Sequence, residues 1–110
     1  MKPVNVRPRA DKEINELADY IASDSLAAAI RFLDAVQKTF ALIGAQPGIG
    51  SLRYAHSTIF DDLRARPVLG FENHLVFYIE RQFYVDVLRV LHGSRDIPAA
   101  LFNDVNQDVL

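Results

Sequence analysis

Apolar residues near the N-terminus follow first a strand pattern and then a helical one. Val4 and Val6 alternate with polar residues ahead of Pro8, which predicts a short strand at a sheet edge. A helix is expected to begin near Asp11, an acidic residue that suits the positive end of the helix dipole. Its apolar residues recur at i, i+3, i+4 and i+7: Ile14, Leu17, Ala18 and Ile21.

A second helix is expected to follow directly. The Ser23-Asp24-Ser25 cluster interrupts the first helical pattern and offers an N-cap for the next helix. The apolar stripe of the second helix comprises Leu26, Ile30, Leu33, Val36, Phe40 and Ile43. This stripe is widened beyond one buried face by Ala28, Phe32, Ala35 and Leu42. Gly44 and Pro47 end the helix. The pattern predicts a helical hairpin with a candidate partner surface on its second helix.

The second half of the chain changes to a period of two. Residues 63–68, 74–80 and 84–92 are predicted to be strands, with turns at residues 70–73 and 81–83 and a loop before them. Short connections make consecutive strands antiparallel. The predicted fold class is α+β, in the order β-α-α-β-β-β, with a helical hairpin packed on one face of a small, twisted, mainly antiparallel sheet.

The period of two also assigns residues to the two faces of the sheet. Leu75, Phe77, Ile79, Leu88 and Val90 are expected under the helices. The opposite, open face is then expected to carry His74, Val76, Tyr78, Glu80, Val85, Val87, Arg89 and Leu91, together with Arg64 and Arg66. Such a face is half apolar and half basic, which makes it a candidate interaction site.

Composition bounds the class of protein. The chain has 110 residues, half of them hydrophobic, and we expect one domain over residues 1–102 and a polar tail over residues 103–110. Since there is no cysteine, disulfides, thiolate metal sites and a thiol nucleophile are excluded. The net charge of −2 argues against a general nucleic-acid binder. The sequence shows neither a signal peptide nor a run of ~20 apolar residues, which predicts a cytoplasmic protein.

Few chemical motifs are present. The sequence contains no glycine-rich phosphate loop, no HExxH motif and no closely spaced histidine pair, so neither a metal nor a cofactor is expected. Asp61-Asp62 lies in a loop, where a solvated turn is the more common role than an acid/base pair. Ser94 lacks the nucleophile elbow of a serine hydrolase. We therefore assign no catalytic residue.

The candidates for contact with a partner are residues of the predicted strands and the segment after them: Arg64, Arg66, His74, Tyr78, Arg89, His92 and Arg95. Arginine is favoured because its planar fork matches carboxylates and phosphates. Structural roles are open for several of them. Arg89 could pair with Asp86 or Glu80, and Arg95-Asp96 could open a short helix. His92 could cap a turn, and Tyr78 could be a packing residue.

The segment GFENHLVFYIERQFYVDVLRVLHGSRD, residues 70–96, resembles the C-terminal half of the ParE branch of the RelE/ParE toxins. The resemblance continues upstream through residues 64–68 (RARPV) and residues 46–50 (QPGIG) to the helical hairpin, and covers about residues 3–102. It implies a toxin of a type II toxin-antitoxin module that inhibits DNA gyrase by binding, without catalysis of its own. The implied partner is a ParD-like antitoxin that folds on binding, with acidic residues that meet the arginines. Direct DNA binding is not expected without that antitoxin.

Two alternatives remain open. The RelE branch of the same superfamily consists of ribosome-dependent messenger-RNA endonucleases, and Arg95 aligns with one of its arginines. Against this reading, His74 stands where that branch typically has arginine, and Leu101 stands about where it has tyrosine. The second alternative is a non-toxic binding module, a relative that holds a partner without poisoning a target.

Overall fold

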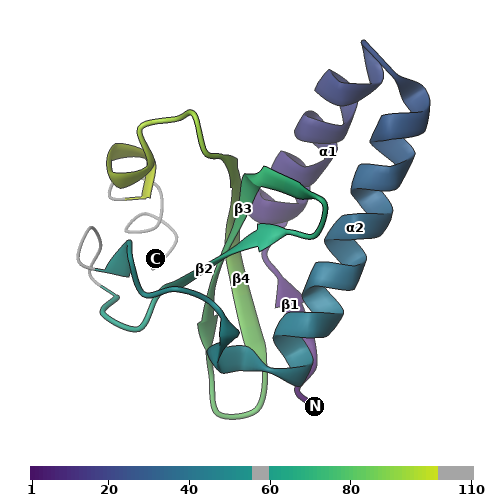
Figure 1. The fold of residues 1–110 in the computed structure, drawn as a ribbon. Coiled ribbons are helices and arrows are strands. Elements are labelled where there is room, and N and C mark those ends of the chain that lie inside the picture. Colours follow the sequence, from purple (N-terminus) through teal and green to yellow (C-terminus); the bar gives the residue numbers. More distant parts are fainter. Residues whose placement is uncertain (56–59, 102–110) are drawn as a thin grey trace.

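The computed structural model describes residues 1–55 and 60–101, and its elements follow the predicted order (Figure 1). The elements are β1 (Val4–Val6), α1 (Pro8–Ala22), α2 (Leu26–Ala45), the 3-10 turn η1 (Pro47–Ile49), β2 (Arg64–Val68), β3 (Phe71–Glu80) and β4 (Val85–His92). The α+β class and the β-α-α-β-β-β order are confirmed. The predicted polar tail lies outside the described residues.

The sheet has four strands in the order β1-β4-β3-β2. β2, β3 and β4 pair antiparallel, whereas β1 pairs parallel with β4 through Val4 to Val6. The first and last strands of the chain are therefore neighbours, and α1 and α2 form a hairpin along one side of the sheet (Figure 1). Because β1 has only three residues, it pairs with just the beginning of β4.

Helix α1 starts earlier than predicted. It begins at Pro8 rather than near Asp11, with Arg7 as the N-cap residue. A proline at the first helical position loses nothing, since its missing N–H would have no partner inside the helix. The cap of α2 is as predicted, because the Ser25 side chain accepts a hydrogen bond from the Ala28 amide at 3.2 Å.

The turn before β3 is also shorter than predicted. β3 begins at Phe71, so the turn reduces to Leu69 and Gly70. Gly70 has a φ of 77°, a left-handed conformation that glycine adopts without a steric penalty. A register shift between Pro67 and Val68 accompanies it.

The predicted assignment of sheet faces is wrong. The core beneath the helices contains Val76, Tyr78, Val85, Val87 and Val90, of which only Val90 was expected there. Phe77, Ile79 and Leu88 lie on the other face, and so does Leu91, as expected. A β-bulge between Phe77 and Tyr78 changes the register, since Phe77 pairs with Arg89 and Tyr78 with Val87. Leu88 is the extra residue, so alternation is interrupted in the middle of β4.

The face away from the helices is not open. Phe77, Ile79, Leu88 and Leu91 pack there against Ala55 and Leu63 and against the helical turn at residues 97–101, which supplies Ile97, Ala100 and Leu101. Asp96 starts that turn, because its Oδ1 accepts a hydrogen bond from the Ala99 amide at 3.3 Å. The sheet is therefore covered on both sides, and the expected half-basic open face does not exist.

Part of the apolar stripe on α2 remains at the surface instead. Leu26, Ile30 and Leu33 are 68%, 60% and 39% exposed. Val36, Phe40 and Ile43 of the stripe are buried, together with Phe32 and Ala35 on the neighbouring side of the helix. Tyr20 of α1 is 80% exposed. We call Leu26, Ile30 and Leu33, which follow one face of α2, the hairpin patch.

Candidate functional site

An ion pair joins α1 to β4. Arg89 is 1% exposed, and its Nε donates to both carboxylate oxygens of Glu13 at 2.9 Å. Glu13 Oε1 also accepts the amide of Val90 at 3.1 Å. The Glu13 carboxylate thereby replaces a strand as the hydrogen-bond partner of β4, at a point on the edge of β4 that β1 does not reach. The structural role considered for Arg89 was an ion pair with Asp86 or Glu80; its ion-pair partner is Glu13 instead, while Asp86 pairs with Arg7 and Arg81 and Glu80 with Lys2.

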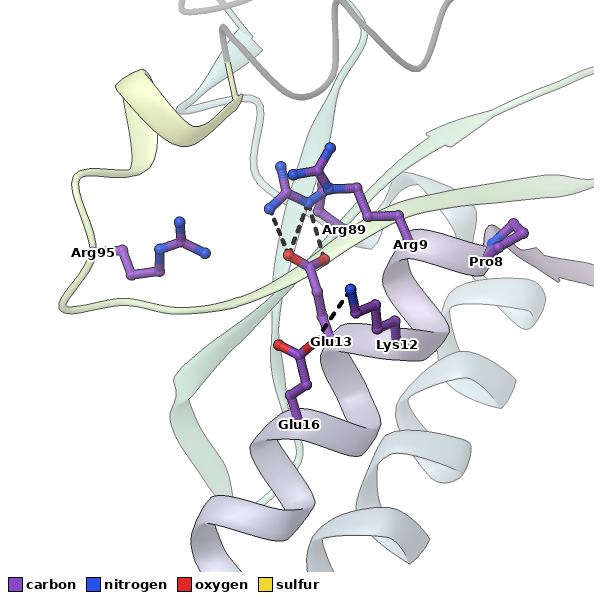
Figure 2. Close-up of a pocket in the computed structure, with 7 residues that line it drawn as sticks. All are labelled: Pro8, Arg9, Lys12, Glu13, Glu16, Arg89 and Arg95. Atoms are coloured by element: carbon purple, nitrogen blue, oxygen red, sulfur yellow. Dashed lines mark hydrogen bonds and ion pairs between the residues drawn. The ribbon is translucent and has the colours of Figure 1, made fainter.

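A pocket of about 590 Å³ opens beside this pair, and its lining is dominated by charge: Pro8, Arg9, Lys12, Glu13, Glu16, Arg89 and Arg95. Figure 2 shows Arg9 and Arg89 extending toward Glu13, and Arg95 reaching into the same region from the loop after β4. Lys12 faces Glu16 at 3.8 Å, and both side chains are exposed. The pocket therefore has four basic and two acidic residues, an excess of positive charge next to the start of α1.

A second, narrower pocket of about 270 Å³ continues from the first along α1 and β4. It shares Glu13, Glu16 and Arg95 with the first pocket and adds the less polar residues Leu17, Tyr20, Val90, Leu91 and His92. We call the two pockets together the α1–β4 groove. Three of the sequence candidates, Arg89, His92 and Arg95, thus line a single surface.

Tyr78 and Arg64 have structural roles at the opposite end of the sheet. The Tyr78 hydroxyl donates to the Pro47 carbonyl at 2.7 Å and accepts the Gly50 amide at 2.8 Å. Burial raises the pKa of Tyr78. A Cβ atom on Gly50 would lie 2.6 Å from that hydroxyl, so only glycine fits there. Arg64 Nη1 donates to the Gly50 carbonyl at 2.8 Å.

Arg64 and Arg66 lie on the helix side of the sheet rather than on the face where they were expected. They pair across β2 and β3 with Tyr78 and Val76, whose side chains belong to the core beneath the helices. Directly opposed residues project to the same face. Both arginines are half-buried at the β2 edge.

His74 and His92 face each other at the other end of β3 and β4. Their ring centroids are 4.9 Å apart, and the His74 ring also packs against Phe32 at 5.0 Å. Burial lowers the pKa of His74, and the charge of His92 lowers it further. Among the described residues, the buried Nδ1 of His74 has no hydrogen-bond partner. The turn after β4 holds the His92 ring in place, because its Nδ1 accepts a hydrogen bond from the Ser94 amide at 3.0 Å.

The seven candidates therefore divide into three places, and no single cluster collects them. A comparison with known protein families identifies the family of this chain. The family model described as the ParE toxin of the type II toxin-antitoxin system, parDE, matches residues 4–97. The chain belongs to the ParE toxin family. No curated protein sequence matches it.

In this ParE-family chain, sequence reasoning missed Glu13, Arg9 and Lys12 as lining of the groove. Glu13 lies in the polar part of the amphipathic helix α1, and its contact with Arg89 joins residues far apart in the chain. No spacing in the sequence signals that contact. The parallel pairing of β1 with β4 creates the contact, because it brings the start of α1 next to β4.

Two further properties follow from the described parts of this ParE-family chain. Across residues 1–55 and 60–101, no set of three histidine or acidic side chains is arranged to hold a metal ion. Neither of the long helices in those same segments has the combination of length and apolar character needed to span a bilayer.

Proposed function

We propose that this toxin acts in the cytoplasm by binding DNA gyrase, without catalysis of its own, and that a cognate ParD-like antitoxin neutralises it. The family match over residues 4–97 carries this proposal. By that family's mode of action, bound toxin traps gyrase in its DNA-cleaved state and halts replication. The gyrase target and the antitoxin type go beyond the match itself and are the parts that need testing.

The positions of the candidate residues support a binding mechanism over the RNA cleavage of the RelE branch. A ribonuclease without a metal requires basic and proton-transferring groups directed at the phosphate. Arg89 is buried in its pair with Glu13, and the Tyr78 hydroxyl is bonded to Pro47 and Gly50. Leu101 is 0% exposed in the core. Tyrosine at Leu101 would therefore require that core to rearrange.

The hairpin patch supports a partner that folds on binding. Large apolar side chains that remain exposed at i, i+4 and i+7 on one face of a helix, as Leu26, Ile30 and Leu33 do on α2, are typical of an interaction surface. An amphipathic segment that is disordered when free can cover such a surface. We assign the antitoxin to this role, because neutralisation of a type II toxin requires a protein bound directly to it.

The decisive experiment combines purified toxin, purified gyrase and supercoiled plasmid. We expect a loss of supercoiling and an increase in linear DNA after detergent and protease treatment, and we expect the adjacent-gene antitoxin to reverse both. Wild-type toxin that leaves gyrase activity unchanged at a large molar excess would refute the gyrase target.

A parallel reaction with translating ribosomes tests the RelE alternative. We expect primer extension to show no codon-specific cleavage of messenger RNA. Cleavage comparable to that of an active nuclease toxin would replace the gyrase proposal. Soluble, folded toxin that arrests neither growth nor either enzyme system would favour a non-toxic binding module.

A further inference from the structure

The α1–β4 groove has a strand edge on one side and a helix on the other. β1 pairs with β4 only as far as Val87, and the last bond of that pair runs from the Arg7 amide to the Val87 carbonyl at 3.0 Å. Beyond Val87, α1 runs beside β4, as the lining of the groove shows, and no further strand pairs there within residues 1–55 and 60–101. The second half of β4 is therefore an edge that a peptide can approach.

The direction of the backbone groups in β4 determines which amides and carbonyls this edge offers to a partner. The Val90 amide points toward α1, because Glu13 accepts its hydrogen bond. The Gly93 amide points the opposite way and bonds to the Asn73 carbonyl at 2.6 Å. Since alternate residues of a strand direct their backbone groups to the same edge, the Val90 carbonyl and the His92 amide both face the groove. An extended segment can pair with these two groups while Glu13 keeps its bond to Val90.

The side chains of the groove define the composition of that segment. Arg95 lines both pockets and is exposed. Among the described residues its guanidinium forms no ion pair, whereas Arg89 is matched by Glu13 and Lys12 by Glu16. Leu17 and Tyr20 form the less polar end of the groove. An acidic residue fits beside Arg95, and apolar residues fit beside Leu17 and Tyr20.

The same charges disfavour a nucleic acid. Glu13 and Glu16 line both pockets, so a phosphate backbone along the groove would meet two carboxylates. The whole chain also has a net charge of −2. A peptide can place one carboxylate at Arg95 and apolar groups elsewhere, whereas a nucleic acid carries a charge at every nucleotide.

We propose that the α1–β4 groove is a docking site for an extended acidic and apolar segment of the antitoxin, which pairs with the edge of β4 and places a carboxylate against Arg95. This assignment rests on the proposed function, since it takes the antitoxin as the partner.

The test measures antitoxin affinity for wild-type toxin and for Arg95→Glu. We expect the charge reversal to weaken binding by about 10- to 100-fold. Arg53→Glu is the matched control, because Arg53 is exposed, lies over the Tyr54 ring at 5.1 Å and is outside both pockets. Its affinity should stay within about twofold of wild type. Thermal melts of each variant show that both remain folded.

Two further measurements identify the contact. In the first, the acidic residues of the antitoxin are replaced by lysine, one at a time. One such antitoxin variant should bind the Arg95→Glu toxin at least about tenfold more tightly than the unaltered antitoxin binds it. Amide exchange at His92 should slow by about tenfold or more in the complex, because that amide gains a strand partner.

The outcomes separate the two levels of the proposal. An antitoxin that binds Arg95→Glu as tightly as wild type, with unchanged exchange at His92, overturns the groove assignment and leaves the proposed function in place. A wild-type toxin that does not bind the antitoxin overturns both. Binding of a short DNA duplex that is lost in Arg95→Glu, with antitoxin affinity unchanged, would assign the groove to nucleic acid instead.

Discussion

Replacement of Glu13 by alanine tests whether the contact between α1 and β4 stabilises the fold. Arg89 is 1% exposed and the Glu13 side chain 13% exposed, so the substitution leaves a buried guanidinium without its carboxylate. Removal of one partner from a buried ion pair typically costs about 3–5 kcal/mol. The Val90 amide also loses its acceptor. We therefore expect Glu13→Ala to lower the free energy of unfolding by about 3–5 kcal/mol.

The expected change in melting temperature follows from the chain length. An unfolding entropy of about 2.1 cal/mol/K per residue converts each kcal/mol into about 4 °C for a chain of 110 residues. Glu13→Ala should then lower the Tm by about 12–20 °C in a calorimetric or circular-dichroism melt. Glu16→Ala is the control, since Glu16 lies one turn further along α1 and its pair with Lys12 is exposed. That pair is worth about 0–1 kcal/mol.

A double variant separates the cost of removing the Glu13 carboxylate from the cost of lost packing. Apolar residues in place of both partners of a buried ion pair are often neutral or stabilising. Glu13→Leu combined with Arg89→Leu should therefore melt well above Glu13→Ala. If Glu13→Ala melts within about 4 °C of wild type, the pair does not hold α1 against β4, and the argument from burial fails.

Three further predictions concern other parts of the molecule. Tyr78→Phe removes the hydrogen bonds to Pro47 and Gly50 and should cost about 1–3 kcal/mol in chemical denaturation, and a cost near zero would contradict the buried bonds. Burial lowers the pKa of His74 in the folded chain below its usual value of 6.5. As the pH falls below about 6.5, His74 therefore takes up a proton more readily in the unfolded chain than in the folded one, and the free energy of unfolding should decline. His74→Phe should flatten that decline, and an unchanged pH profile would refute the assignment. Ile30→Lys should weaken antitoxin binding by about tenfold or more with little change in Tm, because Ile30 is 60% exposed. The control Ala41→Lys, also on the exposed side of α2, should change neither the affinity nor the Tm much.

The order of elements could be predicted because each segment has a clear local pattern. Helical spacing and the Ser25 cap defined the hairpin, and the period of two defined β2, β3 and β4. These signals depend on residues close together in the chain. The pairing of β1 with β4 depends on residues about eighty positions apart and has no local signal. Neither the local patterns nor the family resemblance predicted this pairing, which only the structure shows.

The faces of the sheet could not be predicted for a different reason. Nearly all of β4 is buried, and Val76, Phe77, Tyr78 and Ile79 of β3 are buried in succession. Alternation between polar and apolar residues identifies the buried face only when the other face meets water. Here both faces are covered, and the bulge at Leu88 reverses the phase along β4. For this reason Val85, Val87, Arg64 and Arg66 were predicted on the face away from the helices, whereas they lie on the helix side.

Two of the candidate arginines, Arg89 and Arg95, differ in their surroundings. Arg89 is buried against Glu13, so Arg89→Ala should abolish growth arrest mainly by lowering stability, as Glu13→Ala does. Arg95 is exposed and lines the α1–β4 groove, so Arg95→Ala should leave the Tm within about 2 °C, as expected for a surface side chain. Induced expression in bacteria without antitoxin, combined with melts of both variants, distinguishes the two cases. Growth arrest lost in Arg95→Ala at unchanged Tm would mean that the groove also serves the toxic interaction. Growth arrest retained there would restrict the groove to the antitoxin.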